Sequence, residues 1–356
     1  MTKLYTKVGS PSRHSNLLMK KFITLSVMLI CLLFCRESFG ALPPDIDLEE
    51  MAQDYVLEIK QLNIQGYPTA CNPSIVRWQG KFILSFNAYS IGKEDQPDLM
   101  GLAILDENFN IIGNPQILEV SKNLWQDARL VVLNEALFLV FNGAINGELR
   151  RTFIAQAHFN GIEFSIGLPE VFLNFPGENP NQWERNWIPF VYNNSLLLAA
   201  SLSPHRILRP ILGSQKCEEI ASSHFSSSWT LGIPKTGTTA HLDGKHYLAL
   251  FHSVKVMPSI HSEEKPMQHY FMGAYTFEDA PPFRITAISK EPIIGKHFYH
   301  GPEYTMCKPC RVVFPCGFIM NEQFIWVVFG RQDHEVWMAK LDKKGLYDNM
   351  ELCNLD

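Results

Sequence analysis

The sequence predicts an all-β protein, a five-bladed β-propeller formed by a single domain over residues 41–356. Three observations support this prediction. Few segments have the helical period of 3.6 residues, and most of the chain reads as short apolar strands bounded by Gly, Asn, Asp and Pro. One hairpin unit also recurs along the chain. Hydrophobic residues make up 46% of the 356 residues, which is enough for one large β domain with a buried core.

The recurring unit is an apolar strand, a turn containing Asn, Asp or Gly, and a second apolar strand. Five such hairpins are expected, at 73–86, 129–141, 187–199, 239–251 and 312–329. Their starts are roughly 52–73 residues apart, a period that favours a radial or stacked repeat. Antiparallel sheets of about four strands around a central channel form a propeller. A β-sandwich is the alternative fold.

The first 40 residues are predicted to be a signal peptide. Two lysines directly after Met19 precede the apolar run 22–34, and small residues end the segment before Ala41. Met19 is therefore a second candidate for the start of the protein. The apolar run is shorter than the roughly 20 residues of a membrane span. We expect an exported protein, periplasmic or secreted, with no membrane span in the mature chain; an uncleaved membrane anchor is the alternative.

Charge and cysteine content exclude some classes of function. The net charge is −5 and no long basic run is present, so a nucleic-acid partner is not expected. Six cysteines follow Gly40, which permits disulfides in an exported protein but leaves fifteen pairings open. The motif Cys307-Lys-Pro-Cys310 lacks a second pair of zinc ligands at the usual spacing, so no metal is expected. The oligomeric state stays open.

Polar residues stand at the start of each predicted hairpin, where inner strands of a propeller open into the channel. Charged groups beside apolar strands need partners or solvent. Their recurrence at one place in the repeat predicts a shared pocket with a carboxylic acid, several cations and amide donors. Strand-edge salt bridges or turn caps are the structural alternative. These positions are Asn72, Asp127, Arg129, 184–186, 236–239, Lys308 and Arg311.

Four segments resemble, in order, glycoside hydrolase family 130, the mannoside phosphorylases and β-1,2-mannosidases. Gln126-Asp127-Ala128-Arg129 resembles the family's Asp-Pro-Arg segment, and residues 184–190 resemble its Glu-Lys-Asn-Trp segment. Residues 236–252 are similar to its Gly-rich lead into a strand that ends in a Tyr/Phe-His pair. Residues 312–317, followed by 329–333, resemble its last blade.

The resemblance covers roughly residues 66–342 and implies a five-bladed propeller that acts on β-mannosides. It implies that Asp127 supplies the proton to the glycosidic oxygen. In the family's phosphorylases, cations hold the inorganic phosphate that attacks the anomeric carbon, whereas carboxylates activate water in its hydrolases. Related propellers include mannosyltransferases that use a nucleotide sugar.

The chemistry of glycosidic cleavage supports the same assignment. Cleavage needs an acid at the leaving oxygen and a nucleophile on the other face of the sugar. Arginine binds phosphate oxygens in pairs through its planar fork, so inorganic phosphate is the candidate co-substrate and no other cofactor is expected. We take Asp127 as the catalytic acid. The candidate residues for binding substrate or phosphate are Asn72, Arg129, Arg150, Arg151, Arg185, Asn186, His252 and Asp333.

The sequence also departs from the family pattern. Ala128 replaces Pro, Arg185 replaces Lys, and Lys235-Thr236 stands where an Arg-Gly pair would fit. We expect a carbohydrate-active enzyme that cleaves or forms β-mannosidic bonds in an oligosaccharide or glycoconjugate, as a phosphorylase or hydrolase. A β-mannosyltransferase and a non-catalytic carbohydrate-binding propeller are the alternatives.

Overall fold

The computed structural model describes most of the chain after the predicted signal peptide. The described residues are 46–90, 99–118, 124–145, 149–177, 179, 185–302, 304 and 309–355. The signal-peptide prediction, Glu184, Cys307 and Lys308 lie outside them. Helices are short, and none in the described part is long and apolar enough to span a membrane. They are η1 (Leu48–Met51), η2 (Ile260–Ser262) and α2 (Lys343–Asp348).

Four sheets have the four or five strands typical of a propeller blade. The first consists of β2 (Cys71–Trp78), β3 (Lys81–Ala88), β4 (Leu99–Leu105) and β5 (Ile111–Ile117). The second consists of β6 (Gln126–Leu133), β7 (Ala136–Ile145), β8 (Leu149–Phe159), β9 (Phe164–Ile166) and β10 (Glu170–Val171). The third consists of β11 (Ile188–Tyr192), β12 (Ser195–Leu202), β13 (His205–Ile211) and β14 (Lys216–Ser223). The fourth consists of β22 (Val313–Met320), β23 (Phe324–Arg331), β24 (Glu335–Asp342) and β1 (Val56–Gln61).

The remaining strands form a seven-stranded sheet and a two-stranded sheet. The seven-stranded sheet consists of β16 (Lys235–Thr236), β17 (His241–Asp243), β18 (His246–Met257), β19 (Met267–Glu278), β20 (Ile285–Ser289), β21 (Cys310–Arg311) and β25 (Met350–Leu352). The two-stranded sheet pairs β15 (Phe225–Ser226) with β26 (Asn354–Leu355).

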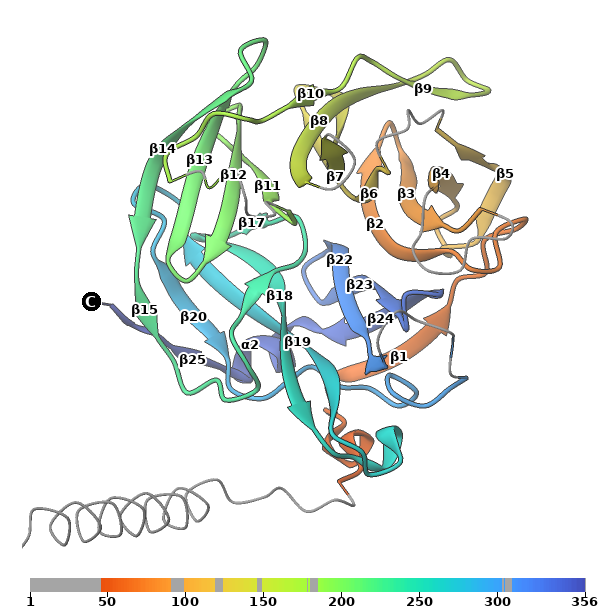
Figure 1. Ribbon diagram of the computed structural model, residues 1–356, viewed down its shortest axis with the longest axis vertical. Coiled ribbons are helices and arrows are strands. Elements are labelled where there is room, and N and C mark those ends of the chain that lie inside the picture. The colour runs from red at the N-terminus through yellow and green to blue at the C-terminus, as the bar shows by residue number, and fades with distance from the viewer. Residues whose placement is uncertain are drawn as a thin grey trace, which may run out of the picture. The chain divides into compact units, whose positions relative to one another are not determined.

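The predicted all-β, propeller-like arrangement is confirmed (Figure 1). The expectation of five like blades is not met, because only four sheets have blade size. The physical reason is the length of β18 and β19, which have 12 residues each. These two strands are longer than the strands of one blade need to be. As a result, β18 pairs with both β16 and β17, and β19 pairs in parallel with β21.

All five predicted hairpins are antiparallel strand pairs: β2–β3, β6–β7, β11–β12, β17–β18 and β22–β23. Three of them turn through two residues with positive φ, which matches the right-handed twist of the strands. These turn residues are Gln79-Gly80, Asn134-Glu135 and Asn193-Asn194.

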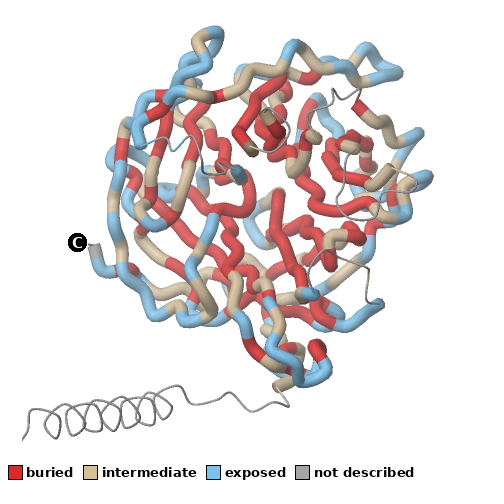
Figure 2. The backbone as a smooth tube through the Cα atoms, viewed as in Figure 1, coloured by how far each residue is buried: buried red, intermediate tan, exposed pale blue. Residues whose placement is uncertain are grey.

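Hydrophobic cores lie between successive sheets and follow one another around the molecule. The β2–β5 sheet packs on β6–β8, and β6–β8 pack on β11–β13. The β11–β14 sheet packs on β18–β20, and β18–β19 pack on β22–β24. A last core joins β23–β24 to β2–β4 and closes the ring. Figure 2 shows the buried residues concentrated in the interior of the sheets and the exposed residues mainly in the outer loops.

Candidate functional site

At the start of each of three strands, a residue with positive φ directs its polar side chain toward the centre. Asn72, Asp127 and Asn186 have φ values of 48°, 56° and 64°, in the left-handed region that Asn and Asp tolerate best. A β-bulge accompanies the first two, between Cys71 and Ser74 and between Gln126 and Arg129. Bulges re-aim side chains, so the structure brings these residues together as predicted.

The Asp127 carboxylate is held by three asparagine amides. Asn87 Nδ2 donates to Oδ1 at 2.7 Å, Asn72 Nδ2 donates to Oδ1 at 3.1 Å, and Asn142 Nδ2 donates to Oδ2 at 3.3 Å. The backbone N–H of Asp127 donates in turn to Asn87 Oδ1 at 3.0 Å. The half-buried carboxylate therefore has one fixed orientation at the centre of the ring.

Asp333 supplies a second carboxyl group beside Asp127. It lies in the turn between β23 and β24, where Gln332 and Asp333 both have positive φ. Burial, followed by the charge of Asp127, raises the pKa of Asp333 to about 6, whereas a side-chain hydrogen bond from Asn72 and the charge of Arg185 lower it. The two carboxyl groups thus share one amide and interact electrostatically.

Two of the predicted arginines have structural partners. Arg129 is buried, and its Nη1 donates to the Asp127 carbonyl oxygen at 2.6 Å and to Asn186 Oδ1 at 3.0 Å. Its Nε donates to the Gly237 carbonyl oxygen at 2.9 Å. Arg129 therefore fixes the backbone beneath the acid.

Arg151 is also buried, and it donates to the carbonyl oxygens of Arg150 and Asn179 at 3.0 and 3.3 Å. Its contacts are those of a residue that holds neighbouring backbone in place.

The charges of Arg150 and Arg185 interact with the carboxyl groups, and Arg150 Nη1 also donates to the Leu124 carbonyl oxygen at 2.6 Å. Burial lowers the pKa of Arg150, the charge of Asp127 raises it, and the charge of Arg185 lowers it, which places all three groups within electrostatic range. Arg185 is exposed at the surface, and its charge also lowers the pKa of Asp333. An anion in this space would meet two positive charges next to the acid.

His252 is neutral, contrary to the expectation that it contributes charge to a phosphate cradle. Burial, followed by the charges of Arg129 and Lys235, lowers its pKa to about 3. Its Nδ1–H donates to the Thr236 carbonyl oxygen at 2.9 Å, so Nε2 is an acceptor. The ring lies parallel to Tyr270, with centroids 6.0 Å apart. His252 can accept a hydrogen bond from a hydroxyl group, but it adds no positive charge.

Two buried polar atoms at the centre, Asn72 Oδ1 and Arg129 Nη2, have no hydrogen-bond partner among the described residues. Buried polar atoms in proteins almost always have a partner, so these atoms mark a place for water or a ligand group. Gly330 gives Asn72 its room, because a Cβ at Gly330 would lie 2.1 Å from Asn72 Oδ1.

The sequence reasoning missed Asn87, Asn142 and an aromatic stack at the rim. His334 lies between Tyr89 and Tyr304, with ring centroids 4.7 and 4.4 Å away. A signal for the two asparagines was present. Phe86-Asn87 and Phe141-Asn142 occupy the same place in successive hairpins, as does Phe251-His252 in a later one.

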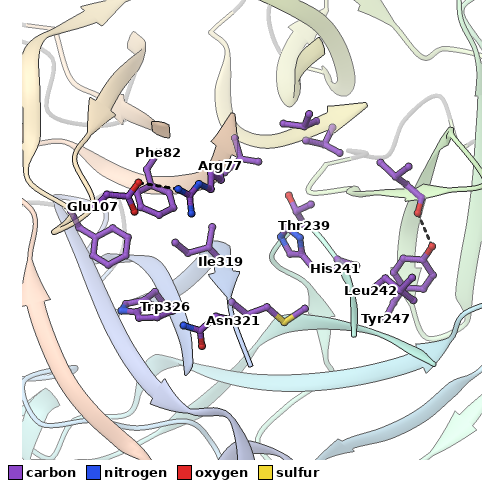
Figure 3. Close-up of a pocket in the computed structure, with 17 residues that line it drawn as sticks. Arg77, Phe82, Glu107, Thr239, His241, Leu242, Tyr247, Ile319, Asn321 and Trp326 are labelled. Atoms are coloured by element: carbon purple, nitrogen blue, oxygen red, sulfur yellow. Dashed lines mark hydrogen bonds and ion pairs between the residues drawn. The ribbon is translucent and has the colours of Figure 1, made fainter. Parts of the chain in front are cut away.

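A cavity lies elsewhere in the described part of the structure. It has a volume of about 620 Å³ and is lined at the other ends of the inner strands, by Val76 and Arg77 of β2, Val131 of β6 and Trp326 of β23 (Figure 3). None of the candidate catalytic or substrate-binding residues lines it, although Thr239, one of the polar residues predicted at the strand starts, does. Asn72 and Asp127 lie near the starts of β2 and β6, so the candidate site and this cavity occupy opposite ends of the strands.

Comparisons with known proteins concern the fold. No family model matches the chain, and no curated protein matches its sequence. Solved structures do match. One is described as "The GH130 family of mannoside phosphorylases contains glycoside hydrolases that target beta-1,2 mannosidic linkages in Candida mannan", with a TM-score of 0.57 and 13% identity over 82% of this chain and 92% of that one.

Two further structures are similar at 11% identity. A β-1,2-mannobiose phosphorylase from Listeria innocua, solved with β-1,2-mannobiose, has a TM-score of 0.53 over 82% of this chain and 92% of that one. A GDP-Man-dependent mannosyltransferase from Leishmania mexicana has a TM-score of 0.54 over 81% of this chain and 91% of that one. At this identity the likeness establishes the fold.

Proposed function

We propose that the protein is a carbohydrate-active enzyme that cleaves β-mannosidic bonds, with Asp127 as proton donor and inorganic phosphate as nucleophile. The observation that carries this proposal is the pair Asp127 and Asp333, which share the Asn72 amide beside the guanidinium groups of Arg150 and Arg185. The resemblance of four ordered segments to glycoside hydrolase family 130 and the mannoside-active neighbours in fold support it.

Each group has a role in the proposed reaction. Asp127 delivers a proton to the glycosidic oxygen as the bond to the anomeric carbon breaks, and a phosphate oxygen forms the new bond to that carbon. The product is mannose 1-phosphate. Arg150 and Arg185 bind the phosphate charge, and Arg129 positions Asp127 through its backbone. The charge of Asp127 helps to raise the pKa of Asp333, so Asp333 retains a proton more readily than an isolated carboxyl group.

The elevated pKa of Asp333 favours a second candidate, a β-mannosidase. A carboxyl group with a pKa of about 6 is suited to act as a general base near neutral pH. In this case Asp333 removes a proton from water, and water replaces phosphate as the nucleophile. The two candidates share the acid Asp127 and differ in the attacking group.

Product analysis separates the candidates. Purified protein is incubated with β-1,2- or β-1,4-mannobiose, with and without inorganic phosphate. Mannose 1-phosphate formed only with phosphate supports the phosphorylase, whereas free mannose at equal rates in both samples supports the β-mannosidase. Transfer that requires GDP-mannose would replace both by a mannosyltransferase. If the protein binds oligosaccharide but turns none over under any of these conditions, the result would support a non-catalytic carbohydrate-binding propeller.

We further propose that the seven-stranded sheet serves as the fifth blade. Cores on both sides of it connect β11–β14 to β22–β24, which supports a ring of five units. An experimental structure in which this sheet stands outside the ring would contradict the proposal.

We also propose export with removal of residues 1–40, on the strength of the basic, apolar and small-residue pattern of this segment. N-terminal sequencing of the mature protein tests it. A mature chain that begins before Phe22 would rule out cleavage at the predicted site.

A further inference from the structure

Away from the candidate site, four side chains that commonly ligate metals meet from three distant parts of the chain. Asp47 and Glu49 lie at the start of η1, His261 lies in η2 at the tip of the β18–β19 hairpin, and His300 lies in the segment between β20 and β21. In Figure 1, η1 (orange) lies beside that hairpin tip, and Ile260 N–H donates to the Ile46 carbonyl oxygen at 3.1 Å.

The spacing of these groups is close to that of a metal site. One ligand atom each from Glu49, His261 and His300 all lie within 4.8 Å of one another. His300 Nδ1 is 2.9 Å from Glu49 Oε2, and His261 Nε2 is 3.0 Å from Asp47 Oδ1. A tetrahedral zinc ion holds its nitrogen and oxygen ligands roughly 3.4 Å apart. We propose that Glu49, His261 and His300 bind one divalent cation, and that zinc is the preferred ion.

His261 Nε2 contacts both a hydrogen-bond donor and a carboxylate. This nitrogen lies 3.1 Å from the Leu48 backbone N–H and 3.0 Å from Asp47 Oδ1. A ring nitrogen either donates or accepts a proton, so it satisfies one of these neighbours and opposes the other. The His261 side chain is only 1% exposed, so water does not relieve the conflict. Asp47 Oδ1 also accepts the Glu49 backbone N–H at 2.9 Å, so Asp47 supports the His261 ring from outside the proposed ligand set.

Glu49 has the supporting contacts expected around a metal ligand. Its carboxylate accepts backbone N–H groups from His297 at 2.8 Å, Tyr299 at 2.9 Å and His300 at 3.0 Å. Such outer contacts fix the orientation of a ligating carboxylate. A set of two imidazoles and one carboxylate suits zinc better than calcium or magnesium, which prefer oxygen ligands alone.

The cation would fasten the first described residues to the seven-stranded sheet. Leu48 and Tyr299 already share a hydrophobic core with β19, and the ion would add a polar link between the same three segments. Its role is structural, and it is independent of the proposed glycosidic chemistry.

Metal content tests the proposal on the purified full-length protein. The protein is stripped with EDTA, loaded with zinc sulfate, desalted, and measured by inductively coupled plasma mass spectrometry. We expect about one zinc per chain and a rise in Tm of about 4 °C on zinc addition. Cobalt in place of zinc should produce the visible absorption of a tetrahedral ion.

The variant His300→Ala removes one ligand whose side chain is 54% exposed, so folding should be unaffected. We expect zinc affinity at least tenfold weaker and no rise in Tm. His224→Ala, an exposed histidine outside the cluster, is the matched control and should bind zinc as the wild type does. Each of three results would overturn the proposal. They are less than one tenth of a zinc ion per wild-type chain, unchanged zinc affinity in His300→Ala, and an equal loss of zinc affinity in His224→Ala.

Discussion

At the scale of single residues, the candidate site depends on asparagine as much as on acids and arginines. Asn72, Asn87 and Asn142 donate to the Asp127 carboxylate, and Asn186 accepts from Arg129. Amides of this kind are uncharged at every pH, so they hold the acid in place without competing for its proton. These amides therefore fix the geometry of the site at every pH.

Asp127→Asn should lower kcat by roughly 10²–10⁴-fold, the usual contribution of a general acid. The fold should persist, because an amide oxygen still accepts from Asn72 and Asn87. The change places one amide NH₂ opposite that of Asn142, which costs about 1 kcal/mol of unfolding free energy. Rates on mannobiose and chemical denaturation measure the two effects. Glu135→Gln, at an exposed turn of the same sheet, is the control and should change neither.

The elevated pKa of Asp333 predicts a pH dependence of stability. A carboxyl group that binds its proton more tightly in the folded state stabilises the fold most at low pH, and this stabilisation is lost as pH rises from about 4 to 6. Asp333→Asn removes the effect. The unfolding free energy of the variant minus that of wild type should therefore increase by on the order of 1 kcal/mol as the pH rises from 4 to 7. Tm values of both proteins at several pH values provide the measurement. A constant Tm difference would show that Asp333 has an ordinary pKa.

At the scale of elements, close packing of inner strands leaves no space for extra atoms. Gly330 of β23 faces Asn72 of β2, and Gly317 of β22 lies against Ser74. These glycines let strands of different sheets approach so closely that a site can form between them. Interiors of this density tolerate added volume poorly.

Gly330→Ala should reduce unfolding free energy by about 1–3 kcal/mol, since the new methyl group would overlap Asn72. Activity should fall as well, because Asn72 contacts both carboxyl groups. Gly167→Ala is the matched control: its new Cβ would have its nearest neighbour at 3.7 Å, so stability should change by less than about 0.5 kcal/mol. Urea denaturation compares the two. Equal losses in both variants would contradict the packing argument.

At the scale of the whole molecule, the first strand completes the last sheet. β1 pairs with β24, with Val56 opposite Leu341, and its inward side chains join the core between β18–β19 and β22–β24. The ring is thus closed by segments from the two ends of the described chain.

Ile59→Asp should lower unfolding free energy by about 2 kcal/mol, because Ile59 packs on that core and a carboxylate there loses its hydration. Leu57→Asp in the same strand is the control; Leu57 is 52% exposed and the change should be nearly neutral. Thermal denaturation of both variants tests ring closure. Equal stabilities would mean that β1 contributes little to the closure.

The hairpins could be predicted from sequence because their signals are local. Paired apolar strands around turns such as Asn193-Asn194 specify their own partners. The seven-stranded sheet as a whole could not be predicted, since β16 and β21 pair through backbone groups that no side-chain pattern marks. The charge state of His252 could not be predicted from sequence either, because its pKa is lowered by burial and by the charge of Arg129, which act only in the folded protein.

The pairing of β1 with β24 has a consequence for the time course of folding. About 280 residues separate the paired positions, so at roughly 5–20 residues per second of synthesis β1 waits about 15–60 s for its partner. During that interval its backbone edge is unpaired and can associate with other nascent chains. Contacts of such high sequence separation also slow folding. We therefore expect yield to depend on what protects this strand until the last residues have been made.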